Sequence, residues 1–263
     1  MKPTIVITGA TGAMGRAAVA SMLNSGWHVV AACRNMDKMR TLFSDGNDDL
    51  ELCHLDLSCK ASIRAFVDAI KGRPIDALWN NAGTLMHHYC LNDEGMDLTF
   101  ATNFVGTARL TMGLLPMLND GASVLSTSSL SCYVSTSHRD FFALPQHRRY
   151  RRIQAYADSK MALTLWCQEL ARREQRLKVN CADPGVVDTD IINLGIPVID
   201  WLCDRLARPL MRSPQQGIQS ALAALHSDVS GYLFRNGRAL PFPHKMVNPE
   251  VASRLYDRML TLL

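Results

Sequence analysis

Short apolar runs along this chain alternate with longer segments in which apolar residues recur every three or four positions. The short runs predict buried strands, and the longer segments predict amphipathic helices. The predicted strands are 4–8, 28–33, 50–55, 76–79, 122–127 and 177–181. The predicted helices are 14–24, 36–43, a helix capped by Ser58 that ends at Ile70, 93–118 with a break near its start, and 153–174.

Strands of nearly continuous apolar character, each followed by a helix, indicate a parallel sheet that is covered on both faces. Right-handed crossovers then favour the doubly wound arrangement known as the Rossmann fold. We therefore predict a single α/β domain over residues 1–263, with a parallel sheet of about seven strands and helices on both faces. Ligands of such sheets bind beyond the carboxyl ends of the strands.

A glycine-rich segment joins the first predicted strand to the first predicted helix. Glycines there let the backbone approach a pyrophosphate, whose charge meets amide N–H groups at the start of the helix. A plain turn that uses glycine for its positive φ is the alternative. The candidate cofactor-binding residues of this segment are Gly9, Thr11, Gly12, Ala13, Met14 and Gly15.

The end of the second strand bears on the choice of cofactor. A carboxylate at this point would accept hydrogen bonds from the ribose of NAD, but the sequence has Cys33 followed by Arg34. A guanidinium suits a 2′-phosphate, so NADP(H) is the preferred expectation and NAD(H) stays open. We expect Arg16 to add charge to the same pocket.

Candidate reacting groups lie later in the chain. Tyr156 and Lys160 are four residues apart near the start of a helix, so their side chains share a face. An ammonium beside a phenol favours the phenolate, so we expect a lowered pKa for Tyr156 and proton exchange near neutral pH. The hydroxyl residues at 126–129 either polarise a substrate carbonyl or satisfy their own turn. Asn103 is an amide within a predicted helix, where propensity disfavours it.

The order of these features along the chain resembles that in the short-chain dehydrogenases/reductases over about residues 4–235. The features are the glycine segment, Asp56, the segment 80–83, these reacting groups and the segment 184–189. The resemblance implies that Tyr156 is the acid/base, that Ser129 orients the carbonyl, and that Lys160 tunes Tyr156 and binds the nicotinamide ribose. It implies that Asn103 holds a water that relays protons to Lys160. The further cofactor contacts that it implies are Asp56, Leu57, Asn81, Ala82, Gly83, Pro184, Gly185, Val187 and Thr189.

Within that family, Leu55-Asp56-Leu57-Ser58, the strand end at Arg34 and the long interval between Ser129 and Tyr156 resemble the retinol-dehydrogenase-like branch. The resemblance implies NADP(H) and a lipophilic carbonyl or alcohol, including retinoids and steroids. Two features depart from the family pattern. The glycine spacing TGxxGxxG is typical of extended, epimerase-like members, and Asp183 before Pro184 could oppose an anionic substrate.

Two segments beside the predicted site complete the picture. Segment 130–152 is a basic insert that either gathers an acidic substrate group or is a solvated charged loop, and we favour the loop. Segment 190–212 is expected to form a substrate lid, whose apolar character predicts a hydrophobic substrate body. Packing of that segment against the sheet or a partner subunit is the alternative.

Composition limits the remaining function classes. Twenty-eight Lys and Arg against 24 Asp and Glu give a net charge of +4, too small an excess to indicate nucleic-acid binding. Eight cysteines without metal-ligand spacing predict free thiols in a reducing cytoplasm and no metal site. No apolar run is long enough to span a membrane, and no secretory signal is apparent.

The leading hypothesis is thus a carbonyl reductase or alcohol dehydrogenase that acts on steroid- or retinoid-like substrates. A non-catalytic NADP(H)-sensing protein and an epimerase for nucleotide sugars are the alternatives. A homodimer and a homotetramer are both open.

Overall fold

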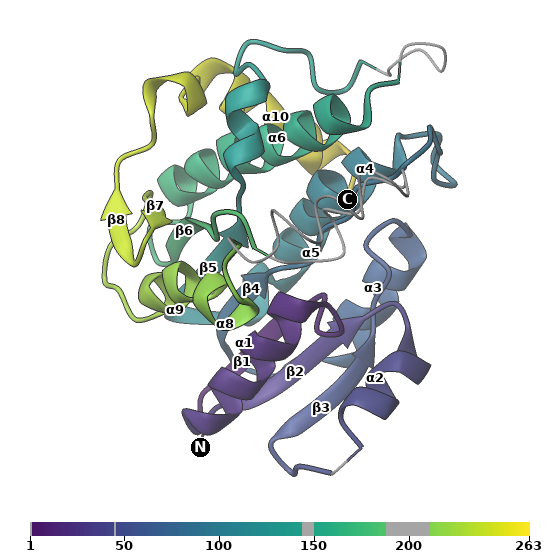
Figure 1. Ribbon diagram of the computed structural model, residues 1–263, viewed down its shortest axis with the longest axis vertical. Helices are drawn as coiled ribbons and strands as arrows, with labels where there is room; N and C mark the ends of the chain where they lie inside the picture. Colours follow the sequence, from purple (N-terminus) through teal and green to yellow (C-terminus); the bar gives the residue numbers. More distant parts are fainter. Residues whose placement is uncertain (1, 45, 144–149, 188–210) are drawn as a thin grey trace.

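Eight strands form one sheet in the order β3-β2-β1-β4-β5-β6-β7-β8 (Figure 1). The computed structural model describes residues 2–44, 46–143, 150–187 and 211–263. The strands are β1 (Thr4–Thr8), β2 (His28–Cys33), β3 (Leu50–His54), β4 (Ile75–Asn80), β5 (Leu118–Thr127), β6 (Lys178–Asp183), β7 (Leu233–Arg235) and β8 (Arg238–Leu240). Their pairing is parallel from β3 to β7, which confirms the predicted doubly wound α/β fold.

The sheet departs from the prediction at one edge. β8 pairs with β7 in the antiparallel direction, so the sheet has eight strands where about seven were predicted. All three residues of β8 are exposed, and such a strand leaves no apolar run in the sequence. β5 also begins at Leu118, within the range predicted as helix, where Leu118 pairs with Ile75 of β4.

The major helices are α1 (Ala13–Asn24), α2 (Met36–Leu42), α3 (Lys60–Ala69), α4 (Leu98–Phe100), α5 (Thr107–Leu114), α6 (Arg152–Arg173), α8 (Pro214–Gly217), α9 (Gln219–Leu225) and α10 (Pro249–Thr261). Shorter turns are the π-helix η1 (Ala101–Gly106) and the 3₁₀ turns η2 (Leu115–Met117), η3 (Leu130–Val134) and η8 (His244–Met246).

The helix predicted over 93–118 is divided. It begins at Leu98, where the Asp97 carboxylate accepts the N–H of Phe100 at 3.0 Å, and it continues through the π-helix η1 into α5. At the end of η1, Gly106 lies against β3–α3 connecting backbone: a Cβ there would stand 1.9 Å from the Leu57 carbonyl oxygen. Only glycine permits this approach, which brings the π-helical turn close to the segment that connects β3 to α3.

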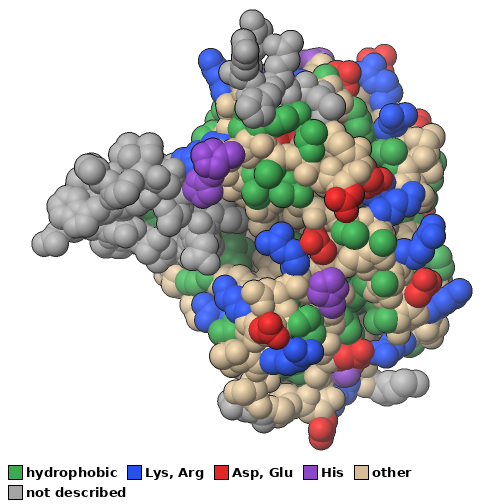
Figure 2. All heavy atoms as spheres, turned by 90° about the vertical axis from the view of Figure 1, so that its right-hand side faces the viewer, with side chains coloured by type: hydrophobic (Ala, Val, Ile, Leu, Met, Phe, Trp, Pro, Cys, Tyr) green, Lys and Arg blue, Asp and Glu red, His purple; other side chains and the backbone are tan. Residues whose placement is uncertain are grey.

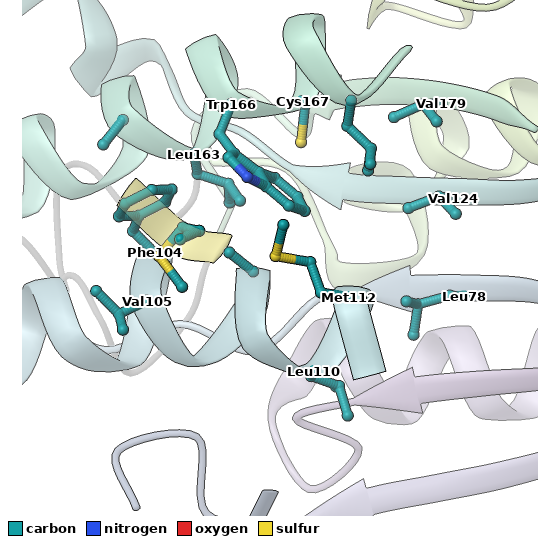
Figure 3. Packing of buried hydrophobic residues seen from close by; sticks show 14 of the residues in the cluster. Leu78, Phe104, Val105, Leu110, Met112, Val124, Leu163, Trp166, Cys167 and Val179 are labelled. Carbon is teal, nitrogen blue, oxygen red and sulfur yellow. The ribbon is translucent and has the colours of Figure 1, made fainter. Parts of the chain in front are cut away.

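Hydrophobic cores cover both faces of the sheet. One face packs against α1, α2 and α9, with Met22 and Met39 fully buried. The other face packs against α3, α5, α6 and α10, and Figure 3 shows Trp166 of α6 and Met112 of α5 pointing toward one another within it. The last helix is fixed by Tyr256, whose ring stacks on Trp166 at a centroid distance of 6.2 Å. Burial on both faces explains why the strands read as continuous apolar runs.

The surface carries mixed charge. On the face drawn in Figure 2, basic and acidic side chains are interspersed and are not segregated by sign. Among the described helices, none has both the length and the apolar character needed to cross a membrane.

Candidate active site

A cleft of about 670 Å³ lies at the carboxyl ends of the parallel strands. The order of the strands reverses there, because β1 pairs with β2 on one side and with β4 on the other. Its walls come from the residues that follow β1 to β6, including the glycine segment, Arg34, Asp56, Leu57, Asn81, Ala82, Gly83, Ser129, Tyr156, Lys160, Pro184, Gly185 and Val187. Thus the structure brings together the predicted site residues with two exceptions, Asn103, which lies behind the wall, and Thr189, which is outside the described residues.

The glycine segment forms a tight backbone cradle at the start of α1. Gly9 has a φ of +68°, and a Cβ on it would come within 2.8 Å of the Cα of Ala82. Gly15 lies in the first turn of α1, where a Cβ would stand 2.1 Å from the Gly9 carbonyl oxygen. Ala13 is the first residue of α1 and lines the cleft without such a conflict. These residues fit a dinucleotide, because backbone N–H groups at a helix start face open space that side chains do not fill.

Thr8 ties this cradle to β4, a role that the sequence analysis missed. Its hydroxyl accepts the N–H of Asn81 at 3.1 Å and the N–H of Ala82 at 3.0 Å. In return, the Asn81 amide donates to the Thr8 carbonyl at 2.9 Å. Asn81 therefore fixes the ends of two neighbouring strands. A threonine directly before the first glycine was the available signal.

Two cations stand at the far end of the cleft, after β2. Arg34 and Lys38 are exposed and line it, and no ion pair engages either of them within the described part of the chain. Lys38 was not predicted; it lies in the first turn of α2, which the Asn35 side chain caps by accepting the Lys38 N–H at 2.8 Å. Arg16 is exposed but is not among the lining residues, so the expectation for Arg16 was wrong.

Asp56 also lines the cleft, with part of its carboxylate already engaged. Its Oδ1 accepts the N–H of Ser58 at 2.9 Å and the hydroxyl of Ser58 at 2.6 Å. The predicted capping residue Ser58 therefore holds Asp56 in place. The helix itself begins at Lys60, after the cap position Cys59.

The two adjacent serines after β5 face opposite ways. Ser128 is buried, and its hydroxyl lies 2.9 Å from that of Thr164 in the core. Ser129 is partly exposed and lines the cleft, where its hydroxyl forms a hydrogen bond with Tyr156. Both residues line the cleft, but successive side chains alternate between faces in extended backbone, so only one of the two side chains points into it. That one is Ser129, the residue that the sequence analysis favoured.

Tyr156 and Lys160 lie together on α6, but their electrostatics differ from the expectation. Burial raises the pKa of Tyr156 to about 12, and the hydrogen bond from Ser129 offsets this only in part. Burial lowers the pKa of Lys160 to about 8. Lys160 Nζ donates to the Thr127 carbonyl at 2.8 Å and lies 5.9 Å from the centroid of the Tyr156 ring. At that separation desolvation outweighs the attraction, so the expected lowering of the Tyr156 pKa was wrong for this state of the protein.

Asn103 is fully buried in the π-helix η1, behind Gly83. Its Oδ1 accepts the N–H of Thr84 at 2.7 Å, and its Nδ2 donates to the Thr84 carbonyl and to the Ser159 hydroxyl, both at 2.9 Å. Both amide hydrogens are thus used by the protein, which leaves only acceptor positions for a water. The water relay assigned to Asn103 stays a prediction.

Asp183 does not present a free carboxylate to the cleft. It is 1% exposed, and its Oδ2 lies 2.9 Å from Nη2 of Arg235. Its other oxygen accepts the N–H of Gly185 at 2.9 Å. The charge is therefore neutralised within the protein, and the suggestion that Asp183 opposes an anionic substrate was wrong.

The two flanking segments are described only in part. Of the segment 190–212, only residues 211–212 are described; there Arg212 N–H donates to the Val186 carbonyl at 2.9 Å, and the lid interpretation otherwise lies outside the described residues. Residues 144–149 of the basic insert are also outside them. In the described part of the insert, Arg139 pairs with Asp158 at 3.2 Å, and both line a second cavity of about 530 Å³ between α4 and the start of α6.

Comparison with known proteins agrees with this fold and site. A family model described as short chain dehydrogenase matches residues 3–143. Human retinol dehydrogenase 13 is 30% identical over 99% of this chain and 84% of its own length. Human polyprenol dehydrogenase is 28% identical over 96% of this chain and 82% of its own length.

Among solved structures, an uncharacterised protein from Mycobacterium paratuberculosis has a TM-score of 0.80 and 26% identity, covering 98% of this chain and 93% of its own. A short-chain dehydrogenase from Shigella flexneri in complex with NADP has a TM-score of 0.70 and 26% identity, covering 90% of this chain and 97% of its own. The chain belongs to the short-chain dehydrogenase/reductase family, and its relatives place it in the retinol-dehydrogenase-like branch that the motifs predicted. It is therefore an oxidoreductase of that family.

Proposed function

We propose that this protein is an NADP(H)-dependent oxidoreductase that transfers hydride between the nicotinamide and a lipophilic ketone, aldehyde or secondary alcohol. The observation that carries the proposal is the convergence of Ser129, Tyr156 and Lys160 on the same cleft as the glycine cradle. When bound, the cofactor supplies the hydride for reduction or accepts it in oxidation.

The protein's own residues would manage the proton and the substrate oxygen. Ser129 donates a hydrogen bond to the carbonyl oxygen and thereby polarises the carbonyl. A pKa of about 12 keeps the Tyr156 phenol protonated at neutral pH, so Tyr156 Oη is ready to give its proton to that oxygen. Lys160 donates one N–H to the Thr127 carbonyl, so two remain to bind the cofactor ribose. Gly83 has no side chain and so leaves space beside the Lys160 ammonium. The protonated phenol is the form that reduction requires, and we propose reduction as the working direction because NADP pools normally supply reducing power.

A lipophilic substrate is supported by the apolar side chains in the cleft. Met86, Leu98, Leu130 and Val186 line it, and Val186 is 53% exposed while Leu130 is 38% exposed. Covering such surface with an apolar molecule is favourable, by about 25 cal/mol for each Å². The names of the relatives, retinol dehydrogenase and polyprenol dehydrogenase, fit substrates of this kind.

A preference for NADP(H) is supported by the two cations after β2, for which no ion pair is found among the described residues. Arg34 and Lys38 line the cleft. The residue at the end of β2, where a carboxylate would bind the ribose of NAD, is Cys33. The Cys33 thiol already donates to the Asn35 carbonyl at 3.2 Å, and burial raises its pKa, so it carries no negative charge to repel a phosphate. The Shigella flexneri structure holds NADP, and a similar one from Escherichia coli holds NADPH.

Turnover is the first test. Purified protein with NADPH and a panel of retinal, steroid and quinone-like carbonyls should consume the nicotinamide absorbance. Tyr156→Phe should abolish that consumption, whereas Tyr232→Phe, a change at a partly exposed tyrosine that does not line the cleft, should leave it intact. Binding of NADPH without turnover of any carbonyl would support the sensing alternative and refute the enzymatic proposal.

The cofactor preference has its own matched pair of variants. Arg34→Ala should weaken NADPH binding at least tenfold and NADH binding far less, because a charged hydrogen bond to a phosphate contributes about 1.5–3 kcal/mol. Arg16→Ala removes an exposed arginine that does not line the cleft and should change neither. Fluorescence titration measures both affinities. Equal losses for NADPH and NADH in Arg34→Ala would contradict the assignment.

A further inference from the structure

A buried group of two hydroxyls and a thiol joins the end of β5 to α6 directly beneath the site. Ser128, Cys132 and Thr164, here called the hydroxyl clamp, are each at most 3% exposed. The Ser128 and Thr164 hydroxyls are 2.9 Å apart, and the Cys132 sulfur lies 3.7 Å from the first and 3.8 Å from the second. The sequence analysis included Ser128 among the candidate hydroxyl residues at 126–129, but it did not single out Cys132 or Thr164.

The direction of these hydrogen bonds follows from counting protons. Thr164 Oγ1 donates its only proton to the Lys160 carbonyl at 2.8 Å. With that proton committed to the carbonyl, Thr164 accepts at the 2.9 Å contact and the Ser128 hydroxyl is the donor there. The remaining lone pairs of Ser128 face the Cys132 thiol, a weak donor. In this arrangement both hydroxyls are bonded, and the contacts hold Ser128 and Thr164 against each other.

The clamp and Lys160 together link the end of β5 to α6. Thr164 holds the carbonyl of Lys160, while the ammonium of the same residue donates to the carbonyl of Thr127 at 2.8 Å. Thr127 and Ser128 are consecutive residues, so the end of β5 is tied to α6 at two points. With the Ser128 side chain held inward, the next side chain, that of Ser129, must face the cleft.

We propose that Ser128 and Thr164 are positioning residues that set the Ser129 hydroxyl against Tyr156 and Lys160. This inference rests on the proposed function, because it assigns a purpose to the geometry of that same site. Loss of either clamp hydroxyl frees the end of β5 to shift relative to α6. Catalysis then falls because reacting groups must be held to within about 0.5 Å.

The chain offers a matched control for Thr164 in α5. Thr111 is also fully buried, donates to the carbonyl four residues earlier at 2.8 Å, and accepts from Asn80 of the neighbouring strand at 2.9 Å. It does not line the cleft. Thr111→Val and Thr164→Val therefore remove the same kind of hydroxyl from the same kind of place, and only the second should disturb the site.

The kinetic test compares three variants with the wild type in NADPH-dependent carbonyl reduction. Thr164→Val should lower kcat at least tenfold and leave KM for NADPH within about twofold, since misplacement of a reacting group acts on the chemical step. Thr164→Ser keeps the hydroxyl and should restore kcat to within about threefold. Thr111→Val should keep kcat within about twofold, even if its thermal midpoint falls as far as that of Thr164→Val. Equal kcat losses in both valine variants would overturn the proposal.

A structural readout separates this inference from the proposed function. Crystal structures of the wild type, Thr164→Val and Thr111→Val should show the Ser129 hydroxyl displaced from Tyr156 by more than about 0.5 Å only in the second. If the wild type reduces no carbonyl, the proposed function fails and this comparison still decides the clamp. If Thr164→Val turns over normally with Ser129 in place, the clamp fails and the function stands.

A second pair of variants covers the case in which Thr164→Val does not fold. Ser128→Ala leaves the Thr164 donation to Lys160 intact and removes only the link to β5. Ser126→Ala, two residues earlier on the same buried side of the strand, is its control. A tenfold loss of kcat in Ser128→Ala, without a loss in Ser126→Ala, supports the clamp, and equal activity in the two refutes it.

Discussion

Lys160 is a charge held almost entirely out of water, so its removal should stabilise the protein. The residue is 2% exposed, and burial lowers its pKa from 10.5 to about 8. That difference corresponds to roughly 3 kcal/mol of destabilisation when the ammonium is present in the folded state. Lys160→Met keeps the length of the side chain and loses the hydrogen bond to the Thr127 carbonyl, which costs about 1 kcal/mol. We therefore expect the variant to be more stable than the wild type by about 2 kcal/mol at pH 7.

The size of this stability difference depends on pH. Below the folded pKa, Lys160 is charged in both the folded and the unfolded chain, and the full cost of burying the ammonium applies. As the pH rises from about 8 toward 10.5, the folded protein loses its proton while the unfolded chain keeps it, so wild-type stability rises. The advantage of Lys160→Met should thus shrink by about 2 kcal/mol between about pH 7.5 and 9.5.

Urea unfolding at several pH values measures this difference directly, from the midpoint and slope of each transition. The exposed Lys71 supplies the control, because Lys71→Met should change the free energy of unfolding by less than about 0.5 kcal/mol at every pH. A Lys160→Met protein that is less stable than the wild type at pH 7 would refute the reasoning. So would a stability difference that does not vary with pH.

Two further predictions concern the cradle and the buried ion pair. Gly15→Ala should abolish NADPH binding and lower the thermal midpoint, because its Cβ would stand 2.1 Å from the Gly9 carbonyl oxygen; Gly12→Ala, with 3.4 Å to the same atom, should be much milder in both assays. Arg235→Met should cost about 3–5 kcal/mol in urea unfolding, because it leaves the Asp183 carboxylate buried without its partner. Adding Asp183→Asn should recover part of that loss, and strictly additive losses would contradict the pairing.

The fold and the grouping of site residues were predictable because both depend on local patterns. The strands are buried on both faces, so each is an apolar run, and the segments that carry the chemistry follow these runs directly. Parallel pairing then brings all their carboxyl ends to one edge. This is why the glycine segment, Ser129 and Tyr156, far apart in the chain, could be assigned to one cleft.

What could not be predicted depends on contacts between distant residues or on burial. The neutralisation of Asp183 requires Arg235, 52 residues later in the chain. The direction of the pKa shift of Tyr156 is set by desolvation, which no spacing of Tyr and Lys reveals. β8 was missed because a short, fully exposed strand has no apolar signature.

The π-helix η1 makes a length change of one residue meaningful at this point of the chain. A turn of this kind holds one residue more than an ordinary α-helical turn, so deleting a single residue from 101–106 would leave the flanking turns continuous. Such a deletion would rotate Asn103 away from Thr84 while α5 kept its packing in the core. The loss of a single codon would therefore remove the amide support behind Gly83 and leave the helices on either side unchanged.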